Sequence, residues 1–308
     1  MSDIEFDDVP TLAGAGPLTA QAHELTDEAV EAEKRRLGVG FWLSVVWVIV
    51  IVGAAILAPW LPIEDPNENL IIRGERPPYP PGSDFWFGSD QDARDIFSRV
   101  IWGGRTSLTV GFAAITFGML VGGSLGTLAG YFRGTSDKVV TFLFVVLLSF
   151  PALVLAILIT SLVDRSLFTI SMTIGVLSVA PVGRVARATT ISFADREFVT
   201  AATTLGAKHP RIIIRELLPN VVIPMSALAL LGVAVAIVAE GGLAFLGLSV
   251  EKGPTWGKLI LLGSSSRDLA EAPWISLMPI LVLFLTVLSL NFAGDRLRSY
   301  FDVKEVSL

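Results

Sequence analysis

The chain has 308 residues, of which 52% are hydrophobic, and its mean hydropathy of +0.66 is far above that of a soluble domain of this length. It contains no cysteine, which excludes disulfides and thiolate metal sites. The formal net charge of −6 argues against a nucleic-acid partner. Together, these values predict a polytopic membrane protein.

The first 36 residues hold the strongest concentration of negative charge. Nine acidic residues precede Lys34, and no sustained apolar period occurs before the basic residues 34–36. We expect residues 1–36 to form an acidic cytoplasmic tail that is helical from about Thr19, with a regulatory or partner-binding role as the alternative to simple solvation. The acidic start differs from the basic first segment of a cleaved signal peptide, so we expect the N-terminus to stay in the cytoplasm.

Six apolar runs are each long enough to cross a bilayer as a helix, which satisfies its own backbone groups where no water is present. The expected spans are residues 41–61, 107–130, 139–162, 167–185, 220–247 and 274–293. The fold class is therefore an all-α membrane protein with six transmembrane helices. Four parts follow along the chain, namely the tail, the first span with its outer loop, a core of five spans and a C-terminal tail: 1–36, 37–105, 106–295 and 296–308.

The distribution of basic residues predicts the orientation of these spans. With both termini in the cytoplasm, 14 of the 23 basic residues lie in inner segments, which is a moderate positive-inside bias. This orientation places the charged stretch 193–219 in the cytoplasm.

The first outer segment, about 62–105, is rich in proline at its start and becomes amphipathic further on. Phe85, Trp86 and Phe87 are typical of an interfacial aromatic anchor. From about residue 96, apolar and polar residues alternate as in a helix that lies along the membrane surface. The charged residues of this predicted outer helix are Arg94, Asp95 and Arg99.

The second span carries glycines every four residues, at Gly118, Gly122, Gly126 and Gly130. Small residues at this spacing form a groove along one helix face into which another helix can pack closely. Close packing is the expected use of the groove, and a sliding surface for alternating access is the alternative.

The stretch Asp195–Pro219 is too polar to lie in lipid. Its apolar residues Phe198, Ala201, Ala202 and Leu205 fall on one face at helical spacing, which predicts a short amphipathic helix with a shallow apolar side. Small alanines suit a helix that is seated in the groove of another protein.

The ends of this predicted helix are marked by four residues. Ser192 or Asp195 would cap its start, and Gly206 would end it in a left-handed turn. Pro210 would then lie in the first turn of a second helix.

Glu240 lies within the fifth apolar run. An acid at this depth is costly and should face protein or water, so it is a candidate functional group. We assign Glu240 to the translocation pathway or a gate, and the alternative is a glutamate that fixes the bundle by hydrogen bonds to helix ends.

Three stretches resemble the permease subunits of ATP-binding-cassette importers in the dipeptide and oligopeptide branch. The charged loop is similar to the family's EAA loop, with Thr200 in place of the first Glu and Glu216 in place of the Ile. The outer segment resembles the signature FGTDxxGRDxxSRxxxGxRxSL, with Ser89 and Ala93 as departures. The end of the chain resembles the run LxxNxxGDxLRDxxDP. Elsewhere, within the third apolar run, Val145 stands where the family often carries an acid. The EAA positions that match are Ala201, Ala202, Gly206, Leu218 and Pro219.

The resemblance covers about residues 83–302 and implies a type I importer permease fold in a bacterial cytoplasmic membrane. It implies that residues 193–219 form the coupling helix, which fits a cleft on an ATPase subunit, and that the outer helix closes the pore or receives a binding protein. The implied partners are a second, non-identical permease, two ATP-binding subunits and an extracytoplasmic substrate-binding protein. The residues assigned to ATPase coupling are Thr200, Ala201, Ala202, Leu205 and Gly206, with Glu197 and Arg211 at the edge.

The chain lacks the motifs of an ATPase. No GxxxxGK[ST] phosphate loop occurs, because the only Gly-Lys pair, Gly257-Lys258, is followed by Leu259. The only histidines, His23 and His209, are both expected in the cytoplasm, which argues against a histidine-built metal site or triad in the membrane. We therefore expect a transport subunit rather than an enzyme, with no catalytic residue, metal or cofactor of its own, and with ATP and Mg²⁺ bound by partner subunits.

Peptide import is the function that the resemblance implies, and import of nickel or another small solute is the alternative because the same motifs serve it. A secondary transporter would need coupling-ion sites on broken helices, usually in two repeated halves, and the loop 193–219 has no second copy. A membrane-embedded enzyme would need clustered catalytic groups, which the spans do not offer.

Overall fold

The computed structural model describes residues 38–306, with side chains described as far as Phe301. The acidic tail 1–36, with its expected helix from Thr19, lies outside these residues. The described part is helical, without a strand. Its longer helices are α2 (Gly38–Leu57), α3 (Ile96–Gly118), α5 (Gly134–Ser149), α6 (Ala152–Leu162), α7 (Leu167–Ala194), α10 (Leu218–Phe245) and α13 (Trp274–Val306). The shorter elements are η1 (Ala58–Trp60), η2 (Met119–Gly123), α4 (Ser124–Phe132), α8 (Glu197–Thr204), α9 (His209–Arg211), η3 (Ile212–Leu217), α11 (Trp256–Leu262) and α12 (Ser266–Glu271).

Within residues 38–306, five helical stretches are long and apolar enough to cross a membrane, and α5 with α6 makes a sixth if this bent pair is one span. With that pair counted as one span, the expected all-α fold of six spans is confirmed. The expectation of an unbroken helix over 139–162 is wrong, since α5 and α6 meet at an angle of 82°. Pro151 explains the break: it lacks an N–H group, and it forces the preceding Phe150 into an extended conformation with φ −86° and ψ 132°.

The second span is much longer than expected and runs over Ile96–Phe132 without interruption. Asp95 caps its start by accepting hydrogen bonds from the backbone N–H groups of Phe97 and Ser98. Ile96 and Val100 are fully buried in the core. The predicted separate helix on the membrane surface is therefore wrong, because these residues form the first turns of the spanning helix.

The glycine spacing of the second span serves close packing against α7. A Cβ atom on Gly122 would lie 3.0 Å from the Cα and carbonyl carbon of Val179, and one on Gly126 would lie 2.9 Å from the carbonyl carbon of Gly183. A β-carbon does not fit at either position, so only glycine lets the two backbones approach this closely. The π-helical turn η2 lies within this contact and contains Gly122. The expected groove for a neighbouring helix is thus confirmed.

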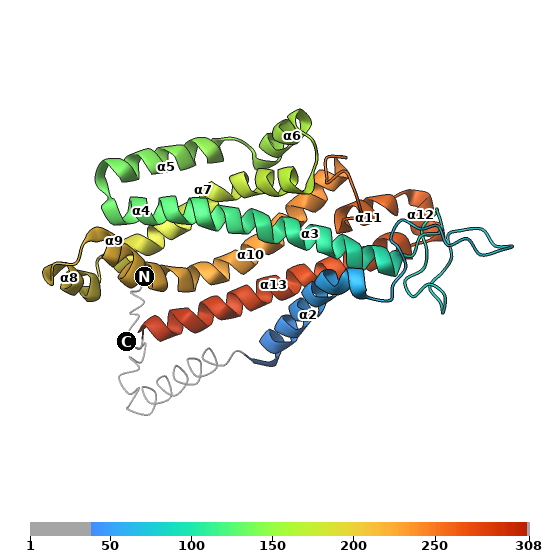
Figure 1. The fold of residues 1–308 in the computed structure, drawn as a ribbon, viewed down its shortest axis with the longest axis horizontal. Coiled ribbons are helices and arrows are strands. Elements are labelled where there is room, and N and C mark those ends of the chain that lie inside the picture. Colours follow the sequence, from blue (N-terminus) through green and yellow to red (C-terminus); the bar gives the residue numbers. More distant parts are fainter. Residues whose placement is uncertain (1–37, 307–308) are drawn as a thin grey trace, which may run out of the picture.

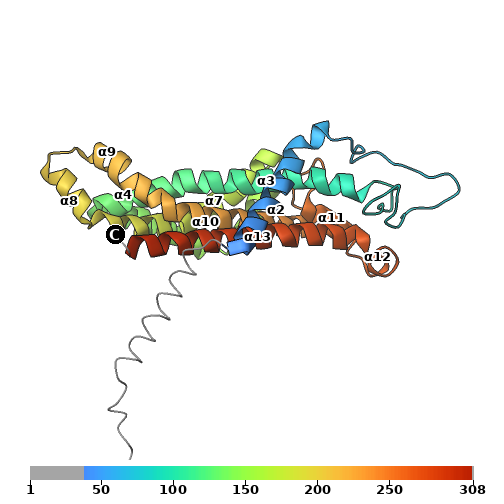
Figure 2. The ribbon, with the colours of Figure 1, turned by 90° about the horizontal axis from the view of Figure 1, so that it is seen from below.

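The bundle has two distinct ends, and both views place α8 and α9 at one end and α12 with the loop 61–95 at the other (Figures 1 and 2). Helix α13 continues past the expected end at residue 293, as far as Val306. Helix α2 packs on α13, and the Trp47 indole N–H donates a hydrogen bond to the Thr286 hydroxyl at 3.2 Å. The fold therefore separates one end that carries α8 from a second end that carries the loop 61–95.

Candidate functional site

Helix α8 lies at the end of the bundle, next to α9 (Figures 1 and 2). As predicted, the chain leaves this helix through Gly206 in the left-handed region, with φ +79°, and Pro210 lies in the first turn of α9. The predicted cap is wrong, since α8 follows Arg196 without a side-chain cap. Ser192 belongs to α7, which runs on to residue 194, and the Asp195 carboxylate instead accepts a hydrogen bond from Arg133 at 2.5 Å.

The apolar residues of α8 point in two directions rather than forming one docking face. Phe198 and Ala202 pack inward, with the buried Val199, against an apolar cluster formed mainly by α7, η3 and α10. Ala201 and Leu205 point outward, and the Leu205 side chain is 87% exposed, the most of any large apolar residue described. The inward face holds the helix on the bundle and leaves the outward face free.

The exposed face of α8 forms a shallow hollow of about 560 Å³. The structure brings four of the residues assigned to ATPase coupling together in this hollow, namely Glu197, Thr200, Ala201 and Leu205. It does not bring Ala202, Gly206 or Arg211 into the lining: Ala202 packs inward, and the other two are exposed elsewhere on the loop. Their coupling role stays a prediction.

Helix α8 is joined to the spans by chain continuity on both sides, and polar contacts link the helices next to it. Residues His209–Phe245 form one continuous helical stretch, so the loop after α8 leads directly into α10. The Tyr131 hydroxyl at the end of α4 contacts Nδ1 of His209 at 2.7 Å. On the other side, Arg187 of α7 makes a two-pronged ion pair with Asp137 of α5. Helix α8 is therefore connected directly to α7 before it and, through α9 and η3, to α10 after it.

Glu240 is fully buried near the C-terminal end of α10. Its carboxylate accepts hydrogen bonds from the Ser107 hydroxyl of α3 at 3.1 Å and from the Ser249 hydroxyl of the following loop. The Ser107 hydroxyl also accepts the backbone N–H of Trp256 at 3.2 Å, and the Trp256 indole donates to the Val100 carbonyl at 2.9 Å. The arrangement ties α10, α3 and α11 at one point, while the assignment of Glu240 to the pathway stays a prediction.

Two of the three charged residues assigned to the outer gate, Arg94 and Arg99, converge on the buried Asp90. Arg99 makes a close ion pair with Asp90, and the Arg94 Nε atom lies 3.3 Å from the same carboxylate. Asp95 is held apart from them as the helix cap described above. Asp90 is the residue that sequence reasoning missed, although its place in the FGSD run was a usable signal. These contacts fix the loop on α3, and the gate role stays a prediction.

The aromatic anchor predicted in this loop is only partly right. The Trp86 side chain is exposed, as an anchor requires, but Phe85 is buried and stacks on Tyr79 at a ring distance of 5.3 Å. Phe87 packs edge-on against Phe97 of α3. The loop thus has a small core of its own that contains Tyr79 and Phe85, whereas Phe87 packs against the main core.

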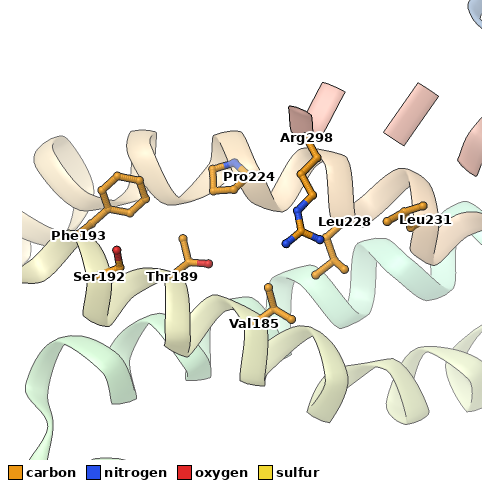
Figure 3. A pocket seen from close by; sticks show the side chains of 8 residues that line it. All are labelled: Val185, Thr189, Ser192, Phe193, Pro224, Leu228, Leu231 and Arg298. Atoms are coloured by element: carbon orange, nitrogen blue, oxygen red, sulfur yellow. The ribbon is translucent and has the colours of Figure 1, made fainter. Parts of the chain in front are cut away.

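A pocket of about 340 Å³ lies between α7, α10 and α13 (Figure 3). The Arg298 side chain reaches into it from α13, and the hydroxyls of Thr189 and Ser192 face it from α7. Pro224 and Leu228 of α10 form an apolar wall. Sequence reasoning did not predict this pocket, because its residues come from three helices that are far apart in the chain.

No group of three or more potential metal ligands occurs among the residues that the structure describes.

Comparisons with known proteins agree with the geometry. Residues 122–304 match the family described as the binding-protein-dependent transport system inner membrane component. The chain is 35% identical over 263 residues, 85% of this chain and 86% of the other, to the dipeptide transport system permease protein DppC of Alkalihalophilus pseudofirmus. It is 32% identical to the di/tripeptide transport system permease protein DppC of Pseudomonas aeruginosa, over 85% of this chain and 87% of the other.

A further relative is the glutathione transport system permease protein GsiD of Escherichia coli, which is 32% identical over 85% of each chain. Among solved structures, the inward-facing MetNI methionine ABC transporter matches with a TM-score of 0.52, at 16% identity, and covers 68% of this chain and 97% of its own. This likeness supports the fold alone. The chain belongs to the family of binding-protein-dependent transport system inner membrane components, and it is a multi-pass membrane permease subunit.

Proposed function

We propose that this permease subunit imports di- or oligopeptides and that α8 couples it to a separate ATPase. The single observation that supports the coupling best is the form of α8, whose inward face is anchored in the bundle while Leu205 and Ala201 line an open hollow. The peptide substrate is inferred from the relatives, whose names refer to dipeptides, di/tripeptides and glutathione.

In this proposal, α8 lies in the cytoplasm together with both chain termini. Two ATP-binding subunits bind ATP and Mg²⁺, one of them receives α8, and the other receives the equivalent helix of a second, non-identical permease. An extracytoplasmic binding protein delivers the peptide at the opposite end, near α12 and the outer loop. Closure of the ATPases moves α8, and differential contacts shift the spans between inward-open and outward-open states.

The proposal is tested with the assembled complex in proteoliposomes. We expect labelled di- and tripeptides to accumulate only when ATP and the binding protein are both present. Accumulation of nickel under the same conditions, without peptide uptake, would replace the peptide substrate by the alternative. Uptake that followed an ion gradient without ATP would contradict the importer mechanism as a whole.

The role of α8 is tested by Gly206→Asp and Leu205→Glu. We expect both variants to insert normally and to lose the link between ATP hydrolysis and uptake, because the changed residues lie at the exposed end of α8. Thr135→Glu is the control, since Thr135 is an exposed residue at the start of α5 and lies outside the hollow. Normal coupled uptake by both α8 variants would count against the assignment.

A further inference from the structure

A second pocket lies at the end of the bundle opposite α8, and the function proposed above assigns it no role. It has a volume of about 250 Å³ and lies between the α6–α7 connection, the loop after α10 and α11. Arg165 and Lys258 contribute the two cations of its lining. They are 93 residues apart in the chain, so the fold alone brings them together.

Both cations are held in place by backbone carbonyl groups. The Arg165 guanidinium donates to the Gly247 carbonyl, and the Arg165 carbonyl accepts the Glu251 N–H at 2.8 Å. The Lys258 ammonium donates to the carbonyls of Glu251 and Gly253, each at 3.1 Å. These bonds use two of the three ammonium protons and one of the five guanidinium N–H groups, so each head group keeps donors for a further acceptor.

The positive charge of the pocket is not neutralised by a direct ion pair. Among the described residues, no carboxylate makes a salt bridge with Arg165 or Lys258. Burial lowers the pKa of Lys258, and the charges of Arg165 and Arg99 lower it further, whereas Glu240 and Glu251 act in the opposite sense. Lys258 thus interacts with charges of both signs, but neither carboxylate makes a direct ion pair with its ammonium group.

The rest of the lining is mixed, with the polar side chains of Ser249 and Glu251 beside apolar ones, and it limits what can enter. Ala244, Val250 and Leu261 line the pocket beside the two cations. A volume of about 250 Å³ is below the range of about 300–1,000 Å³ that is usual for whole small-molecule ligands. The pocket therefore suits one charged group with a short apolar part rather than an entire peptide or lipid.

We propose that Arg165 and Lys258 form a binding site for a carboxylate or phosphate group at the outer end of the bundle. Such oxyanions accept charge-assisted hydrogen bonds from guanidinium and ammonium groups, and they neutralise the two like charges. The group comes either from the C-terminal carboxylate of a transported peptide or from the phosphate of a lipid head group. The peptide source rests on the proposed function, whereas the site itself does not.

Binding is measured on the purified full chain in nanodiscs of phosphatidylcholine. The probes are alanylalanine, its C-terminal amide and inorganic phosphate, titrated by calorimetry and by the shift in unfolding temperature. We expect alanylalanine and phosphate to bind, and the amide to bind at least tenfold more weakly, because it lacks the anionic group. A second experiment uses nanodiscs with added phosphatidylglycerol in place of the soluble probes. If the group comes from a lipid, the unfolding temperature of the chain should be higher in these nanodiscs than in phosphatidylcholine alone.

Arg165→Gln and Lys258→Gln should each weaken oxyanion binding about tenfold, or remove the effect of phosphatidylglycerol. Lys252→Gln is the matched control, because Lys252 lies in the same loop with an exposed side chain outside the pocket. Lys258→Arg should keep binding. Because the glutamine variants also remove hydrogen bonds to the loop, Leu261→Trp is a second test, which fills the pocket and keeps both cations.

The outcomes separate the site from the transport function. Loss of binding in the glutamine variants and Leu261→Trp, but not in Lys252→Gln, supports the site, even if the complex transports no peptide. The proposed site would be overturned by two results together. Alanylalanine and its amide would bind equally well, and phosphatidylglycerol would have no effect on stability that depends on Arg165 or Lys258.

Discussion

The Ser107 hydroxyl of α3 lies 3.1 Å from a carboxylate oxygen of Glu240 on α10, and it also accepts the backbone N–H of Trp256 at 3.2 Å. One small side chain thus joins two membrane helices to the start of α11. Because Glu240 is fully buried, no solvent water can take its place as the acceptor for the two serine hydroxyls.

Glu240→Ala should destabilise the protein by about 2–4 kcal/mol, because Ser107 and Ser249 lose their acceptor in a buried site. Glu240→Gln keeps an acceptor oxygen and should lose less. The measurement is the thermal unfolding midpoint of the purified chain, and Glu251→Ala, at an exposed position in the loop after α10, is the control.

The same variants separate the two roles considered for Glu240. If Glu240 only holds the helices together, peptide uptake by the Glu240→Gln complex should fall only as far as the stability of that variant falls. A Glu240→Gln complex with native stability and no uptake would instead favour the pathway role. An unchanged unfolding midpoint in Glu240→Ala would contradict the structural one.

Adjacent glycines in η2 offer a matched test of helix packing. A Cβ atom on Gly122 would meet the backbone of Val179 in α7, whereas one on Gly123 would meet nothing within 4 Å. Gly122→Ala should therefore cost about 1–3 kcal/mol by forcing the helices apart. Gly123→Ala should be neutral or slightly stabilising, since alanine is the better helix former. Unfolding midpoints of the two variants check this, and equal values would show that η2 and α7 do not pack as described.

Much of this architecture could be predicted from the sequence because it depends on local patterns. The apolar runs predicted the spans, the spacing of Gly122 and Gly126 predicted a close helix contact, and Gly206 predicted the left-handed end of α8. At the three glycines, the backbone itself sets the residue type, because a side chain would not fit at Gly122 or Gly126 and would be strained at Gly206.

Other features were missed for two physical reasons. Hydropathy does not register a lost backbone hydrogen bond, so the Phe150-Pro151 break was read as part of one continuous span. Periodicity gives the faces of a helix but not its neighbours, so the pairing of Ser107 with Glu240, 133 residues apart, could not be predicted. The division of the α8 residues between inward and outward faces likewise depends on where α7 and η3 lie.

Two ion pairs near the α8 end should differ in their contribution to stability. Arg187 binds Asp137 through two guanidinium nitrogens, and these side chains are 31% and 20% exposed. Arg133 binds Asp195 through one nitrogen, and those side chains are 49% and 65% exposed. Solvent screens the second pair more strongly, and its single contact restricts the geometry less.

Arg187→Ala should therefore lower the unfolding free energy by about 1–2 kcal/mol, and Arg133→Ala by less than about 0.5 kcal/mol. Arg187→Lys should recover only part of the loss, because an ammonium group cannot bridge both carboxylate oxygens in the same way. Double-mutant cycles with Asp137→Asn and Asp195→Asn measure the two coupling energies. A larger coupling for the Arg133 pair would contradict this ranking.

Asp95 should make the stability of the protein depend on pH. Burial raises the pKa of this carboxyl above its ordinary value of 3.8, and the charge of Glu64 adds to the rise, although hydrogen bonds from the Ser98 and Phe97 N–H groups oppose it. The folded state then binds the proton more tightly than the unfolded state. The resulting stabilisation is fully present below pH 3.8 and is lost as the pH rises through the folded pKa.

Asp95→Asn tests this because asparagine caps a helix about as well as aspartate and carries no charge. At pH 7, we expect the variant to be as stable as the wild type or slightly more so, since the buried charge is gone. As the pH is lowered toward 4, the unfolding midpoint of the wild type should rise relative to that of Asp95→Asn. Asp95→Ala should lose about 1 kcal/mol at neutral pH because the cap itself is removed. If the wild type instead gained on Asp95→Asn as the pH rose, the hydrogen bonds at the helix start would outweigh burial, and the pKa of Asp95 would be lowered by folding rather than raised.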